Sequence, residues 1–310
     1  MRAAVRRYRE QMAEFAEASN LEVWYACLDA ETARDHLTAG ASQRDAKHVD
    51  RDLRKGLRRN HLGAFTKLIG VTDGEPHFVS DPPLVVPVEE LLDEDGRRRY
   101  VSVIRRFLER YRQSLQSDRR HLIEEYRFVH LARKLVGVGS VGSRAWVVLM
   151  IGRDESDPLV LQLKEAQRSV LEPYAGPYER PDRGRRVVEG QRLMQAASDH
   201  LLGWYRLRAL DGRRHHFYVR QLWDGKASID VTKLSPAGLS HYADMCGWTL
   251  ARAHARSGLR ISIAAYLGDS DAFDHAVAEF ATAYADVNER DHAALRDAIA
   301  DGRLPAVTGV

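Results

Sequence analysis

The sequence lacks most features that mark a secreted, metal-binding or membrane protein. Its 310 residues include two cysteines, Cys27 and Cys246, which are too far apart for a metal motif and too few for a disulfide framework. No apolar run reaches the roughly 18 residues that a membrane helix needs. The basic start also lacks the apolar stretch of a signal peptide. These absences predict a cytoplasmic protein with no membrane partner.

Charge of one sign is also scarce. Lysine and arginine number 47 against 44 acidic residues, so the net charge is only +3, which does not indicate a nucleic-acid partner. Only seven of the basic residues are lysines. A lysine inside an apolar run is therefore hard to explain as a surface residue, and Lys164 in VLQLKEA is such a lysine.

The order of hydrophobic patterns predicts an α+β fold. Residues 1–130 have mostly helical spacing, with a proline-rich extended connector near 76–88. A helix is expected over residues 98–135, broken near Gln116 to Asp118. Residues 131–226 contain β-rich runs, a hairpin signal at Asp211-Gly212 and one helical run. Residues 227–310 are helical, so we expect an antiparallel sheet with one inserted helix, flanked by helical segments.

Three glycines, Gly137, Gly139 and Gly142, form a G-x-G-x-x-G motif. A dinucleotide fold requires a helix after the last glycine, whereas the strand-like SRAWVVLMIG follows, and a P-loop requires a G-K-[ST] that is absent. A kinase-type loop remains, in which a glycine-rich turn between two antiparallel strands covers phosphates. There the next strand carries a lysine and the following helix a glutamate that pairs with it. Lys164 and Glu189 stand at these places. A hairpin whose glycines only permit tight turning, with Lys164 at a strand edge, is an equally open interpretation.

The same residues resemble the bacterial domain of unknown function 2252 family. The matching runs cover essentially the whole chain and include VGVGSVGSR, LQLKEAQRSVL, RRVVEGQRLMQAASDHLLGW, FYVRQLWDGKAS, CGWTLARAHARSG and YLGDSDAFDHAVAEFATAYADVNERDH. The resemblance implies a relative of the protein-kinase-like fold. It also implies a segment before Met1 with motifs similar to G-D-x-H-x-x-N and N-D-F-D-E, the catalytic loop and the metal-binding aspartates. Neither motif is present in this sequence.

Two stretches were weighed as substitutes for these motifs. HVDRDLRKGLRRN is superficially similar to a kinase catalytic loop, but the required asparagine position holds Leu57, and Asn60 is eight residues beyond Asp52. A solvated basic helix face is the better interpretation. DAFDH, from Asp271 to His275, is explained as a helix N-cap with first-turn acids.

Two hypotheses of different class follow. The first is a kinase-like protein that binds ATP with Mg²⁺, a partial phosphotransferase whose catalytic aspartates come from a missing segment or a separate chain and whose phosphate acceptor is unknown. Arg220, Asp224 and Lys226 would lie near its site. The second is a non-catalytic remnant or interaction scaffold without nucleotide binding. In the ATP-binding hypothesis, Lys164 contacts the phosphates, Glu189 orients Lys164, and the adenine faces backbone groups near Gln221 and Leu222. The backbone N–H groups that cover the phosphates belong to Gly137, Gly139, Ser140 and Gly142.

Overall fold

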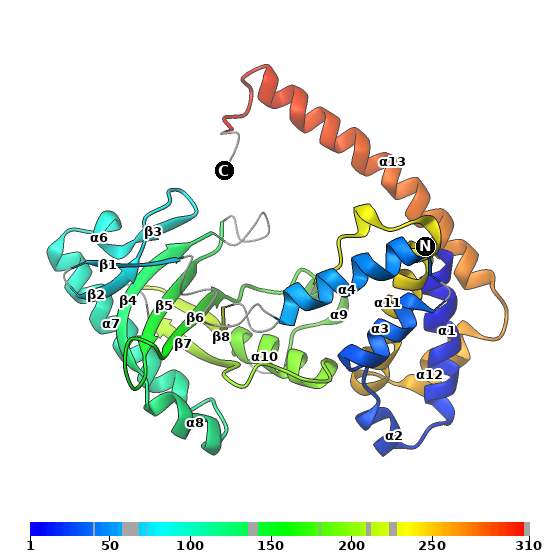
Figure 1. Cartoon of the computed structure of the whole chain (residues 1–310), viewed down its shortest axis with the longest axis horizontal. Coiled ribbons are helices and arrows are strands. Elements are labelled where there is room, and N and C mark those ends of the chain that lie inside the picture. Colours follow the sequence, from blue (N-terminus) through cyan, green and yellow to red (C-terminus); the bar gives the residue numbers. More distant parts are fainter. Residues whose placement is uncertain are drawn as a thin grey trace. The chain divides into compact units, whose positions relative to one another are not determined.

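The computed structural model describes residues 1–39, 41–57, 68–72, 74–135, 142–179, 181–208, 212–222 and 228–306. These residues combine helices with an antiparallel sheet, which confirms the α+β class (Figure 1). They divide into two units, one of Met1–Arg54, Leu193–Ala196 and Ser228–Val310 and the other of Lys55–Arg192 and Ala197–Ala227. In the described part of the chain, no helix has the length and apolar character needed to cross a membrane.

This grouping differs from the expected division at residues 130 and 226. The N-terminal helices belong with the C-terminal helices, and residues 55–130 belong with the sheet. The reason is long-range packing that local periodicity does not report. Helix α1 (Arg2–Glu17) packs along α11 (Pro236–Ser257), and strand β3 (Val85–Pro87) pairs with the sheet.

The larger sheet has six strands in the order β3-β4-β5-β6-β8-β7, and every neighbouring pair is antiparallel (Figure 1). Strand β6 is therefore an interior strand between β5 and β8. A separate hairpin joins β1 to β2. The strands not yet bounded are β1 (Ile69–Thr72), β2 (Glu75–Phe78), β4 (Arg127–Lys134), β5 (Ala145–Ile151), β6 (Pro158–Glu165), β7 (Gly203–Arg208) and β8 (Arg214–Gln221).

Both faces of this sheet bury apolar side chains, because successive residues of a strand point to opposite faces. On one face, Leu161 and Leu163 of β6 pack in a core with Phe107 of helix α7 (Glu94–Arg112). On the other, Val160 packs in a second core with Phe78 of β2 and with Val147, Leu149 and Leu222. Beyond Val160, this second face becomes polar at Gln162 and Lys164.

The expected helix over residues 98–135 is only partly correct. The predicted break near Gln116 to Asp118 is confirmed, because helix α7 ends at Arg112 and α8 (Ser117–Glu124) begins at Ser117. Residues 127–134, however, form strand β4 rather than a helix end. Pairing with β5 on one side and β3 on the other overrides the helical spacing of RFVHLARK. The described residues of this unit also form helices α6 (Val88–Leu91), α9 (Glu172–Ala175) and α10 (Arg183–Met194).

The second unit is helical. Helices α1 and α11 approach so closely that a Cβ atom on Gly247 would lie 2.2 Å from the Ala4 carbonyl oxygen, so only glycine fits there. Helix α2 begins with a capping box between Ser19 and Glu22. The remaining elements are α2 (Asn20–Tyr25), α3 (Ala30–Thr38), α4 (Gln43–Leu57), a 3₁₀ turn (Val231–Lys233), α12 (Arg260–Leu267) and α13 (Ala272–Ala300).

Helix α4 has the solvated basic face that its sequence indicated, with its arginines and lysines exposed, but its opposite side is polar and buried, which was not expected. Three of its polar residues are buried, namely Asp45, His48 and Asp52. Asp45 accepts hydrogen bonds from the backbone N–H and the hydroxyl of Ser235, and Asp52 accepts one from the backbone N–H of Asp230. His48 lies 3.1 Å from Asp52. This face of α4 therefore binds the backbone that leads into α11, which gives Asp52 a structural role.

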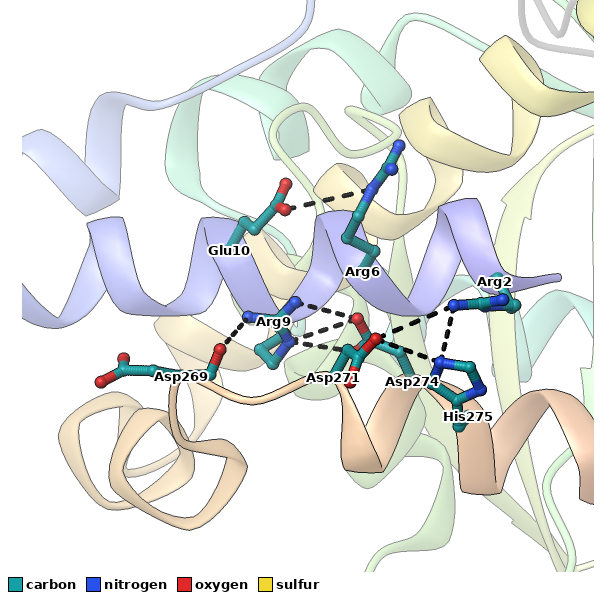
Figure 2. A network of polar contacts seen from close by, with 8 residues as sticks. All are labelled: Arg2, Arg6, Arg9, Glu10, Asp269, Asp271, Asp274 and His275. Carbon is teal, nitrogen blue, oxygen red and sulfur yellow. Dashed lines mark hydrogen bonds and ion pairs between the residues drawn. The ribbon is translucent and has the colours of Figure 1, made fainter.

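The first turn of α13 is tied to α1 by a buried ion pair, which Figure 2 shows. The guanidinium of Arg9 contacts both oxygens of Asp274, with its nearest distance 2.9 Å, and also donates to the carbonyl of Asp269. The hydrogen bond to Asp274 raises the pKa of Arg9. Asp271, at the N-cap, makes no side-chain capping bond, contrary to expectation, and instead contacts Arg2 and His275 at the exposed rim.

Candidate functional site

The loop that carries the glycine motif joins two neighbouring antiparallel strands, β4 and β5. Gly137, Gly139 and Ser140 lie outside the described residues. The last glycine, Gly142, has φ of 80°, a left-handed conformation that favours glycine over any residue with a side chain. The antiparallel pairing of β4 and β5 fits both the kinase-type interpretation and the plain hairpin.

Lys164 lies on β6, directly opposite Ala145 of β5 on one side and Tyr218 of β8 on the other. Because β6 is an interior strand, Lys164 does not lie at a sheet edge. Its side chain is half-buried, and among the described residues no carboxylate lies within 4.0 Å of its ammonium group. Burial lowers the pKa of Lys164, and the nearby charge of Arg220 lowers it further.

Arg220 and Gln162 are the neighbours of Lys164 that define this site. They stand opposite each other on β8 and β6, on the same face as Lys164. The Arg220 Nε donates to Gln162 Oε1 at 3.2 Å. Within the described ranges, Arg220 forms no ion pair with a carboxylate. Lys164 and Arg220 are therefore two adjacent half-buried cations whose charges no described carboxylate balances. We call Gln162, Lys164, Tyr218 and Arg220 the Lys164 face.

Helix α10 packs over β7 and β8 beside the Lys164 face, where Gly184 approaches Phe217 and Trp204, but its glutamate does not reach the lysine. Arg185 lies over the ring of Trp204, which stands opposite Tyr218. Glu189 accepts hydrogen bonds from Arg185 at 2.6 Å and from the Tyr178 hydroxyl at 2.5 Å. The expected ion pair between Lys164 and Glu189 is absent among the described residues, because the i,i+4 partner on the same helix takes the carboxylate.

The two residues expected to face an adenine through their backbone are already engaged. The N–H of Gln221 donates to Asp199, and the N–H of Leu222 donates to the carbonyl of Val160 at 2.9 Å. The Leu222 side chain is buried in the core beneath β2. Neither donor is available to a base unless one of these hydrogen bonds breaks. The two N–H groups are therefore occupied in this structure, and the expectation that backbone groups near Gln221 and Leu222 face an adenine stays a prediction.

A cluster missed in the sequence holds the exit of the glycine loop against β6. Glu165 accepts hydrogen bonds from the backbone N–H of Arg144 at 3.1 Å and lies 2.7 Å from Nδ1 of His215. These three residues come from the loop end, β6 and β8. Only the strand register brings them together, so no local signal could have indicated them.

This cluster predicts a pH dependence. Burial alone would raise the pKa of Glu165, but the hydrogen bonds from His215 and the Arg144 amide outweigh it, so the pKa is lowered below the ordinary 4.5. The folded state therefore binds fewer protons at this site than the unfolded state. The contribution of Glu165 to the free energy of unfolding is complete above the unfolded-state pKa and is lost as the pH falls through the lower folded-state pKa. Urea unfolding should show Glu165→Gln less stable than wild type at pH 7, with the difference shrinking at pH 3. A difference independent of pH would contradict this assignment.

Comparison with known families gave one match. The family described as "Uncharacterized protein conserved in bacteria (DUF2252)" matches residues 1–298. The chain belongs to the DUF2252 family. This membership confirms the resemblance that the motifs carried, and DUF2252 spans both structural units. No curated protein and no solved structure matched the chain.

The description of DUF2252 names no activity, so the chemistry has to be argued from the residues of this chain. The described part contains no group of three or more histidine, cysteine or acidic side chains that could hold a metal ion. What it does contain is the Lys164 face, a set of hydrogen-bond donors on β6 and β8.

Proposed function

We propose that the protein is kinase-like and binds the phosphates of ATP with Mg²⁺ on the Lys164 face. The observation that carries the proposal is the pair of adjacent half-buried cations, Lys164 and Arg220, with no carboxylate within 4.0 Å among the described residues. Like charges held together in a partly desolvated place cost free energy, and the lowered pKa of Lys164 reports that cost. A bound phosphate removes it, because ammonium and guanidinium groups both bind phosphate oxygens strongly.

The order of elements supports the same proposal. The glycine loop lies between antiparallel strands β4 and β5, the lysine is on the next strand, β6, and α10 follows before β7. A kinase-type nucleotide site needs these parts in this order. For Glu189 to orient Lys164, its carboxylate must leave Arg185 and Tyr178. Phosphate binding does not depend on that step. Phosphoryl transfer further requires a carboxylate that positions the acceptor and a metal ligand, and in the proposal a separate chain supplies both.

A second function, an interaction scaffold without nucleotide binding, is favoured by two other observations. Glu189 pairs with Arg185 rather than with Lys164, and the N–H groups of Gln221 and Leu222 are used inside the protein. A scaffold requires neither group to be available. The two functions make opposite predictions about Lys164.

The test is calorimetric titration of the chain with ATP and Mg²⁺. We expect wild type to bind and Lys164→Met to lose on the order of tenfold or more in affinity, because one charge-assisted contact is removed. Lys55→Met is the matched control, since Lys55 is exposed on α4 and lies outside the sheet. Equal binding by wild type and Lys164→Met would refute the site, and no binding by wild type would favour the scaffold.

A further inference from the structure

We propose that the Lys164 face recognises the phosphate chain of its ligand rather than the base, with Gln162 and Arg220 as the specificity-determining pair beside Lys164. The ligand class is then a di- or triphosphate, whatever base it carries. This inference rests on the proposed function and goes further, because it states which part of the nucleotide is recognised.

Gln162 provides the first argument, because one end of its amide has no partner. The side chain is 1% exposed, its Oε1 accepts from Arg220, and its Nε2 has no hydrogen-bond partner. The orientation of the amide is fixed, since Arg220 Nε is only a donor and a flipped amide would place two donors against each other. A buried N–H without an acceptor is costly, and almost all such groups find one. An oxygen-rich ligand on this face supplies the acceptor.

The spread of donors provides the second argument. Lys164 and Gln162 are two residues apart on β6, which places their Cα atoms roughly 6.7 Å apart along the strand. Arg220 stands opposite Gln162 on β8. The ammonium, the amide and the guanidinium thus form an L-shaped set of donors that is longer than a single phosphate. Consecutive phosphates match such a set better than one phosphate does.

The groups around the Lys164 face that a base would use are mostly occupied. Apart from Tyr218, the apolar side chains on this side of the sheet, Val147, Val160 and Leu222, are already packed in the core with Phe78. The backbone donors at the end of β8 are used by Asp199 and Val160. These occupied groups leave the phosphate chain as the part of the ligand that Lys164, Gln162 and Arg220 contact.

In the first experiment, Mg²⁺ is present throughout. The full chain is titrated in separate runs with ATP, GTP, inorganic tripolyphosphate and adenosine. We expect the three triphosphates to bind with affinities within about one tenfold step of each other and adenosine not to bind. Binding of ATP without GTP or tripolyphosphate would overturn this inference and leave the proposed function standing. No binding of any triphosphate would overturn both.

The second experiment uses Gln162→Glu, titrated with Mg²⁺ tripolyphosphate. The carboxylate keeps the contact with Arg220 but repels a phosphate, so we expect at least a tenfold loss of affinity. Gln162→Met, which removes the amide without adding charge, should change affinity in the same direction. Arg214→Met is the control, because Arg214 is exposed at the far end of β8, roughly 20 Å from Arg220. Thermal melts establish that each variant folds. Unchanged affinity in folded Gln162→Glu would show that Gln162 does not meet the ligand.

Discussion

Replacing Arg9 by methionine is expected to lower the free energy of unfolding by about 3–5 kcal/mol. Asp274 has only 3% of its side chain exposed, and Arg9 is its partner through contacts to both carboxylate oxygens. Methionine keeps much of the packing but leaves a buried carboxylate without its cation, which is the costly half of breaking a buried pair. Urea unfolding at neutral pH, followed by circular dichroism, measures the change.

Two variants control this prediction. Arg2→Met removes a cation of the same network whose side chain is 61% exposed, and an exposed pair of this kind contributes about 0–1 kcal/mol. The double variant Arg9→Met with Asp274→Leu removes both charges and should recover much of the lost stability, because no buried charge remains unpaired. If Arg9→Met costs no more than Arg2→Met, the joint between α1 and α13 does not depend on this pair.

Gly184→Ala should destabilise the protein by about 1–3 kcal/mol, although alanine normally favours a helix. A Cβ atom at this position would lie 2.3 Å from the carbonyl oxygen of Phe217 on β8. That oxygen is backbone in the middle of a paired strand, so no side-chain rotation relieves the overlap, and α10 has to move away from the sheet.

The direction of the stability change distinguishes a packed helix from an exposed one. In an exposed helix, glycine to alanine gains up to about 1 kcal/mol. Urea unfolding of Gly184→Ala therefore tells a packed α10 from an exposed one. A gain in stability would mean that α10 is not packed on β8. Because α10 packs on β8, which carries Tyr218 and Arg220 of the Lys164 face, we expect the same variant also to weaken binding of tripolyphosphate.

Much of the local structure was predictable. The helical spacing at the start of the chain predicted helix α1, whose Met12 and Phe15 are buried. The break before α8 and the hairpin of β7 and β8, whose Gly212 has φ of 74°, also followed from residue types. The errors arose where distant segments compete with local preference. Strand β4 was expected as helix, and the buried polar side of α4, opposite its solvated basic face, was not expected.

The candidate site divides in the same way. The placing of Lys164 on a strand after the glycine loop needed only the order of patterns along the chain, because a strand's period and a glycine-rich turn are encoded within a few residues. Which residues surround Lys164 was decided by strand register, since a shift of one residue sends every side chain to the other face. Register brought Gln162 against Arg220 and Glu165 against His215. Strand register joins residues that are far apart in the sequence, and Arg144 and His215, which it brings together, are 71 positions apart. No local sequence pattern contains that information.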